Sequence, residues 1–179
     1  VFEESCRILA AWQQQGIMLT LSVNLSAIQL REPSMVTHLQ ELIERHRICP
    51  GSLMLEITET ADVGKPEQAL QLLQALQKTG VAVALDDFGM GYANLNWLNQ
   101  FKSLPVAKLK MDRSFVAVLP QDDTMVRIVS SIAEIMQLDV IAAGVETDEQ
   151  RDEAAQVQDD DAPGEAGRRP RRDRAEPAP

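Results

Sequence analysis

Residues 81–89 read VAVALDDFG, and this stretch decides the fold that the sequence predicts. A β-prone apolar run of five residues ends directly in two aspartates. Comparable runs of β-branched and aliphatic residues recur about every thirty residues along the chain. They lie at residues 19–25, 53–58, 106–111 and 139–143.

Helical patterns fill the intervals between these runs. Residues 66–79 and 124–137 carry Leu, Ile and Met at helix spacing, and residues 2–15 form an amphipathic pattern that Gly16 ends. Short strands that alternate with helices are typical of a parallel sheet with helical crossovers. The sequence therefore predicts an α/β fold.

The acidic composition excludes one class of function. The chain has 179 residues, with 27 Asp and Glu against 17 Lys and Arg, and its formal net charge is -10. Affinity for nucleic-acid phosphates comes from clustered Lys and Arg. We therefore expect no DNA partner.

Cysteine content and hydropathy indicate a soluble, cytoplasmic chain. Cys6 and Cys49 form neither a metal-ligand spacing nor a disulfide framework, which is typical of a reducing compartment. No apolar run approaches the roughly 20 residues that span a bilayer, so we expect no membrane span. The chain begins at Val1 inside a helical pattern, which suggests a longer parent, and that parent can itself be membrane-anchored.

The C-terminal segment differs in composition from the rest. Residues 156–179 contain four prolines and five arginines, and Val157 is their only sizeable aliphatic side chain. Such a composition predicts disorder, because too little apolar surface is available to form a core. A natural disordered tail explains it, but we favour translation in a wrong reading frame, since Arg, Pro, Ala and Gly have GC-rich codons.

Polar side chains stand at the C-terminal ends of the predicted strands. They are Asn24, Glu56, Asp86, Asp87, Lys110 and Glu146. In parallel α/β folds the loops that follow the strands build the active site. We therefore expect these side chains to converge on one rim of the sheet.

Several carboxylates on one rim predict a site for divalent metal. Without a cation they would repel one another, and oxygen-rich clusters are what Mg²⁺ and Mn²⁺ require. Two such ions can clamp the attacking and leaving oxygens of a phosphodiester and activate water, so the pattern predicts phosphodiester hydrolysis. Lys110 is the candidate to hold the water or to neutralise phosphate charge.

Simpler interpretations exist for each of these residues. An aspartate at a strand end is often only a helix N-cap, Asn24 can satisfy a turn, and Lys108 beside Lys110 can be an ordinary edge charge. Recurrence on several strands favours a shared site over these alternatives. His38 and His46 lie on a polar helical segment, and we expect both to face solvent without a role.

Five motifs, taken in order, resemble those of the EAL-domain cyclic di-GMP phosphodiesterases. They are VNLS at 23–26, LEITE at 55–59, LDDFGMGY at 85–92, LKMD at 109–112 and GVET at 144–147. The resemblance runs from about Phe2 to Asp152. It implies a modified TIM barrel that opens cyclic di-GMP to linear pGpG with two Mg²⁺ or Mn²⁺ ions.

The resemblance also implies roles for individual residues. Asn24, Glu56 and Asp86 match metal ligands, and Asp87 matches the second ligand of the aspartate pair. Lys110 corresponds to the lysine that contacts the nucleophilic water.

Further matches concern the surroundings of the metals. Glu59 matches a glutamate that anchors the loop after the aspartate pair, and Glu146 matches the second acid of the Glu-Gly-Val-Glu motif. The loop itself, residues 88–94, would couple metal binding to formation of a homodimer. Met90 stands where the family usually has Thr, Ala or Ser.

Departures from the family pattern are equally informative. The Glu-Ala-Leu segment would precede Val1, and Ala143 replaces the first acid of Glu-Gly-Val-Glu. From about Glu153 the expected Gln-Gly pattern gives way to the Arg- and Pro-rich tail. We therefore predict a partial EAL domain at 1–152, an incomplete barrel of five strands with two open edges, and a disordered tail at 153–179.

These departures leave three functional hypotheses. The leading one is the middle of a cyclic di-GMP phosphodiesterase whose catalysis is impaired, because a carboxylate near the second metal is lost. The alternatives are a degenerate module that binds cyclic di-GMP or a protein partner without cleaving it, and an inactive truncated product. An upstream sensory or GGDEF domain in the parent is left open.

Overall fold

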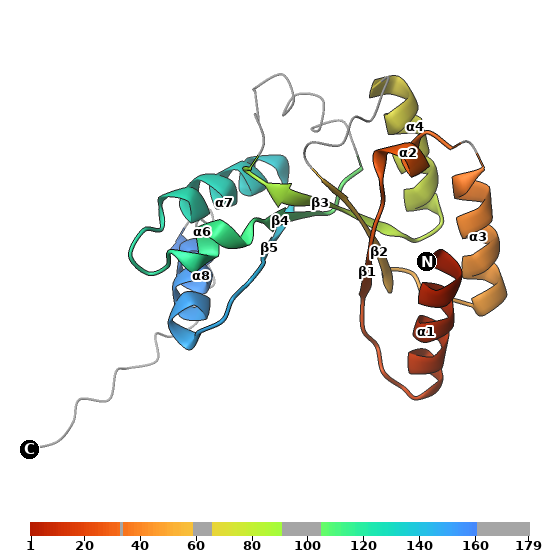
Figure 1. Ribbon diagram of the computed structural model, residues 1–179, viewed down its shortest axis with the longest axis horizontal. Coiled ribbons are helices and arrows are strands. Elements are labelled where there is room, and N and C mark those ends of the chain that lie inside the picture. The colour runs from red at the N-terminus through yellow and green to blue at the C-terminus, as the bar shows by residue number, and fades with distance from the viewer. Residues whose placement is uncertain (33, 59–65, 91–104, 161–179) are drawn as a thin grey trace, which may run out of the picture.

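Five parallel strands form one sheet in the computed structural model, which describes residues 1–32, 34–58, 66–90 and 105–160 (Figure 1). The strands pair in chain order and are β1 (Leu21–Asn24), β2 (Leu53–Thr58), β3 (Ala82–Phe88), β4 (Lys108–Met111) and β5 (Asp139–Ala142). All five predicted strands are confirmed, each within a few residues of its expected bounds. Among the described strands, β1 and β5 each pair on one side only.

Helices connect the strands and cover one face of the sheet. They are α1 (Phe2–Gln14), α2 (Ala27–Leu30), α3 (Met35–His46), α4 (Pro66–Lys78), α6 (Arg113–Ala117), α7 (Thr124–Met136) and α8 (Asp148–Asp160). Parallel neighbours require such crossovers, because a tight turn cannot return the chain to the same end of the sheet. None of the helices in the described ranges is long and apolar enough to cross a bilayer.

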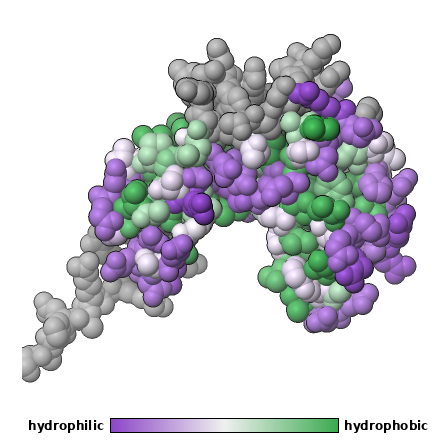
Figure 2. All heavy atoms as spheres, in the orientation of Figure 1, coloured by the Kyte–Doolittle hydropathy of each residue, from purple (hydrophilic) through white to green (hydrophobic). Residues whose placement is uncertain are grey.

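The two faces of the sheet differ in chemistry because side chains alternate along each strand. Leu55, Leu85 and Leu109 are fully buried on the face that the helices cover. Glu56 and Lys110 occupy alternate positions on the opposite face. Figure 2 shows hydrophilic side chains gathered over the strands, between the two groups of helices.

Two hydrophobic cores lie under the helices, and β3 contributes to both. Leu39 of α3, Leu73 of α4 and Val83 of β3 belong to the first core. Leu85 of β3 and Val129 of α7 belong to the second. Figure 1 shows the corresponding helices at opposite ends of the sheet, with α1, α3 and α4 at one end and α6, α7 and α8 at the other.

The thiols agree with the expectation of free cysteines. Cys6 and Cys49 are both unpaired, Cys6 fully buried and Cys49 half-buried. Burial raises the pKa of the Cys6 thiol, and the charge of Glu3 adds to this effect. Cys6 therefore packs as a small apolar side chain.

One expectation for the histidines was wrong. His38 is exposed as expected, but His46 is largely shielded, and its Nε2 lies 3.0 Å from Glu3 Oε1. Arg45 Nη1 lies 3.4 Å from the other oxygen of the same carboxylate. These contacts join α3 to α1, which the helical pattern alone does not reveal.

The last helix extends into the segment that we expected to be disordered. α8 continues to Asp160, and within it Ala154 is buried and Val157 is fully buried. Both side chains pack in the second core, because one turn of helix places them on the same face. Residues 153–160 therefore differ from the expected tail, and residues 161–179 lie outside the described part of the chain.

Replacing Val157 tests whether this helix belongs to the folded unit. We expect Val157→Ala to lower the free energy of unfolding by about 2 kcal/mol, because it removes two buried methyl groups and leaves a cavity. Gln156→Ala, at the exposed neighbouring position, should change it by less than about 0.5 kcal/mol. Urea denaturation followed by circular dichroism measures both values, and equal values would place Val157 outside the cooperative core.

Candidate functional site

Four of the predicted side chains come from neighbouring strands and share one face of the sheet. Asn24 is the last residue of β1 and lies in register with Glu56 of β2. Asp86 of β3 lies in register with Thr58, two residues after Glu56. Lys110 of β4 completes the set, and period-two alternation gives it the same face as Lys108, which pairs with Ala84.

Lys110 forms ion pairs with acidic side chains of two strands, β2 and β3. Its Nζ lies 2.7 Å from Glu56 Oε2 and 2.9 Å from Asp86 Oδ1. The three side chains are only 18%, 7% and 17% exposed respectively. The predicted convergence of these three residues on one rim is therefore present in the structure.

Burial and charge act in opposite directions on Lys110. Desolvation alone would lower the pKa of its ammonium group. Hydrogen bonds to Glu56 and Asp86, together with their charges, outweigh this effect and leave the pKa raised. Lys110 is therefore a firmly protonated cation between two carboxylates.

A bulge in β3 shapes the aspartate pair. The pairing of β3 with β4 shifts between Leu85 and Phe88, so that Asp86 and Asp87 share one step of the ladder. Asp87 has φ of 54°, a left-handed conformation that Asp tolerates better than most residues. A regular strand would point successive side chains to opposite faces, and the bulge breaks that rule here.

Asp87 is the exposed member of the pair. Burial raises its pKa, and the nearby charges of Asp86 and Asp112 raise it further, whereas Lys110 lowers it. Asp87 lies next to Asp86 in the bulge, at the border of the charged cluster. Asp112, in contrast, is a helix cap, because its Oδ1 accepts a 2.8 Å hydrogen bond from the Ser114 backbone N–H at the start of α6.

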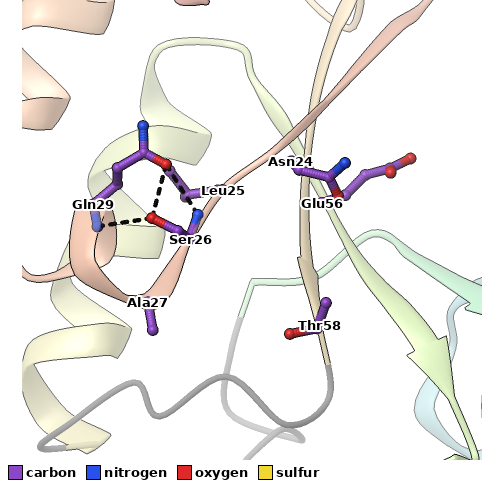
Figure 3. Close-up of a pocket in the computed structure, with 7 residues that line it drawn as sticks. All are labelled: Asn24, Leu25, Ser26, Ala27, Gln29, Glu56 and Thr58. Atoms are coloured by element: carbon purple, nitrogen blue, oxygen red, sulfur yellow. Dashed lines mark hydrogen bonds between the residues drawn. The ribbon is translucent and has the colours of Figure 1, made fainter.

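A cavity of about 390 Å³ opens beside Asn24 and Glu56 (Figure 3). Its lining residues come from the ends of β1 and β2 and from α2, and they are Asn24, Leu25, Ser26, Ala27, Gln29, Glu56 and Thr58. Figure 3 shows the Asn24 and Glu56 side chains close to each other, on the opposite side from Gln29. Polar groups of two strands thus border one hollow.

Ser26 and Gln29 have a structural role in this hollow. They form a capping box, in which the Ser26 Oγ accepts from the Gln29 N–H and the Gln29 Oε1 accepts from the Ser26 N–H. Strand β1 ends at Asn24, so Ser26 starts α2. The sequence signal for Gln29 was a serine followed three residues later by glutamine.

The remaining predicted site residues are placed differently. Glu146 is exposed in the segment between β5 and α8, where its backbone N–H donates to Gln150 Oε1. No hydrogen bond or ion pair joins its carboxylate to the described residues, so the structure does not bring it into the cluster. Glu59 and residues 91–94 of the expected dimer loop lie outside the described residues.

The charged cluster does not in itself form a metal-ligand group. Across the described ranges, no three His, Cys, Asp or Glu side chains lie close enough together to hold an ion. Asn24 contributes an amide oxygen rather than one of these groups, and Lys110 stands between Glu56 and Asp86. All four predicted metal ligands nevertheless offer oxygen, the atom that Mg²⁺ and Mn²⁺ prefer.

The sequence matches one known protein family over most of its length. The EAL domain family matches residues 1–167 of the 179. The chain belongs to the EAL domain family.

Characterised relatives share about a third of the residues of this EAL domain. The bifunctional diguanylate cyclase/cyclic di-GMP phosphodiesterase MucR of Pseudomonas aeruginosa is 35% identical over 156 residues, which are 85% of this chain and 22% of MucR. Cyclic di-GMP phosphodiesterase PdeR of Escherichia coli K12 is 35% identical over 146 residues, or 79% of this chain and 21% of PdeR. The chain therefore spans roughly a fifth of the length of these relatives.

Solved EAL structures have the same fold. The structure of PaMucR phosphodiesterase in complex with c-di-GMP superposes with a TM-score of 0.78 at 31% identity, covering 87% of this chain and 64% of that one. The EAL domain of Mycobacterium smegmatis DcpA gives 0.79 at 36% identity, covering 87% and 70%. The expected incomplete EAL-type barrel is confirmed.

Gly89 supports the aspartate bulge, and its replacement tests that support. A Cβ at Gly89 would lie 2.6 Å from Phe115 Cε2, and φ there is +97°. We expect Gly89→Ala to destabilise the fold by about 2 kcal/mol or more, because strain and overpacking add.

Gly51→Ala is the matched control for this change. Gly51 has φ of +80°, but nothing lies within 4 Å of an added Cβ. Backbone strain alone should cost about 1 kcal/mol there. Thermal unfolding of both variants measures the difference, and a smaller loss for Gly89→Ala would contradict the packing of this turn on α6.

Proposed function

We propose that this chain carries the substrate-binding and metal-binding end of a cyclic di-GMP phosphodiesterase, which opens cyclic di-GMP to linear pGpG. The observation that carries the proposal is the contact of Lys110 with Glu56 and Asp86 on the face of the sheet opposite the helices. Membership of the EAL domain family and similarity to the cyclic di-GMP phosphodiesterases MucR and PdeR support the same reaction.

The donor atoms are of the kind that Mg²⁺ and Mn²⁺ bind. Asn24, Glu56, Asp86 and Asp87 offer only oxygen atoms, and the pairing of Lys110 with two of them shows that this rim accommodates positive charge. Such ions, when bound, polarise a phosphodiester and lower the pKa of attacking water. We propose these four residues as the ligands.

The side chains of this chain would contribute positioning and charge. The Lys110 ammonium can donate hydrogen bonds to the attacking water or to a phosphate oxygen. Asp87, exposed beside it, can accept a proton as water attacks. Asn24 and Glu56 border the cavity, where one end of the dinucleotide would be held.

Ala143 supports impaired catalysis and a second candidate function. It follows β5 directly, at the position where the family resemblance predicts a carboxylate. A methyl group there cannot attract a second cation, and loss of one ion from a pair would remove several kcal/mol of transition-state stabilisation, by order of magnitude. Binding of cyclic di-GMP without cleavage is therefore the second candidate function.

We propose Glu146 only as a secondary contributor to catalysis.

Restoring the carboxylate tests the proposed reaction. We expect Ala143→Glu to raise conversion of cyclic di-GMP to pGpG in Mn²⁺ by about tenfold or more, because it returns negative charge near the second ion. Ala143→Gln, of the same size but uncharged, should leave the rate near that of the parent chain. Chromatography of the nucleotides measures both, and no pGpG from Ala143→Glu would reject the hydrolytic assignment.

Calorimetry separates binding from cleavage. We expect cyclic di-GMP to bind the unmodified chain in Mn²⁺, and Asp86→Asn to weaken that binding, because it removes one charge from the proposed ligand set. Asp139→Asn, which changes an exposed carboxylate on β5, serves as the control. Equal affinities for the two variants would contradict a role for Asp86 in the ligand site.

A further inference from the structure

We infer that Lys110 is an internal counter-cation that competes with divalent metal for Glu56 and Asp86, and that it thereby sets the metal affinity of the site. This inference rests on the proposed function only in naming the metal as competitor. It assigns Lys110 a second role, exercised before substrate binds.

The geometry makes it difficult for the Lys110 ammonium group and a divalent cation to contact the same two carboxylate oxygens at once. Lys110 Nζ lies 2.7 Å from Glu56 Oε2 and 2.9 Å from Asp86 Oδ1, so it occupies the point between them. A divalent cation held by the same two oxygens would need the position that the ammonium group occupies. The ammonium group must therefore withdraw from that point before an ion can bridge both strands.

Burial makes the competition costly for the metal. Glu56 is buried and Asp86 is largely shielded, so water can do little to stabilise their negative charges in place of the ammonium group. Two carboxylates at this depth repel each other unless a cation stands between them. Lys110 relieves that repulsion in the metal-free protein, and a bound ion gains only the difference between its own attraction and that of Lys110.

The chemistry of lysine suits a cation that must move. Its ammonium group sits on a flexible four-carbon stem, so it can leave the carboxylates and remain near the same rim. An arginine would hold two carboxylates with a rigid fork and would yield less readily. Lys110 therefore both offsets the repulsion between Glu56 and Asp86 and determines how tightly a divalent cation can bind them.

Lys108 provides a matched comparison on the same strand and face. Its Nζ lies 3.0 Å from Asp139 Oδ2, but Asp139 is exposed, and this is the one acid that Lys108 contacts among the described residues. Replacing Lys108 removes the same charge from the same strand without leaving two shielded carboxylates together. Any effect specific to Lys110 is thus separable from a general change of charge.

The experiment is a Mn²⁺ titration by calorimetry, without nucleotide. It compares the unmodified 179-residue chain, called the parent chain here, with Lys110→Met and Lys108→Met. We expect Lys110→Met to bind Mn²⁺ about tenfold more tightly, because the competing ion pair is gone. Lys108→Met should stay within about twofold of the parent chain. Lys110→Arg, which keeps the charge, should bind no more tightly than the parent chain.

Thermal unfolding supplies a second measurement. Lys110→Met should melt at a lower temperature than the parent chain without metal, and Mn²⁺ should raise its melting temperature by more. Lys110→Gln retains hydrogen-bond donors and serves if the methionine variant does not fold, and it too should bind Mn²⁺ more tightly.

The outcomes distinguish this inference from the proposed reaction. Unchanged or weaker Mn²⁺ binding by both neutral variants, or no binding by any variant, would overturn the role of Lys110 as competitor. Tighter binding by the variants together with no hydrolysis by Ala143→Glu would instead reject the reaction and leave the competition standing.

Discussion

Two carboxylates and one ammonium group constrain the rest of this structure. They meet on the face of the parallel sheet that lies opposite the helices. Glu56 and Asp86 come from adjacent strands, and each would be unfavourable at its depth without Lys110 between them. Three strands must therefore keep their register for the charges to balance. The three charged side chains lie on the face opposite the helices, whereas Leu55, Leu85 and Leu109 on the covered face are aliphatic.

The bulge after Leu85 adapts a regular strand to this charge pattern. Alternation would send one of the two consecutive aspartates into the apolar layer beneath the helices. The left-handed backbone at Asp87 avoids that outcome, and Gly89 allows the chain to turn closely against Phe115. Strain at a few backbone positions thus accompanies the placement of charge, as is common at functional sites.

Much of the fold could be predicted from the sequence, because strand and helix periods are local properties. The five strands and the helices at 2–15, 66–79 and 124–137 follow from the spacing of apolar residues. The convergence of Glu56, Asp86 and Lys110 followed from parallel topology. In contrast, the contact of His46 with Glu3 and the burial of Val157 depend on how separate helices pack, and composition misled the interpretation of residues 153–160.

Strand β3 contributes side chains to both hydrophobic cores, and Val106 packs against both of them. Val83 is anchored in one core and Leu85 in the other, and the charged cluster straddles the seam between them. Glu56 lies on a strand whose aliphatic side chains pack in the first core, and Lys110 lies on a strand whose aliphatic side chains pack in the second. Their ion pair therefore spans the boundary between the two cores and adds a polar connection across the middle of the sheet.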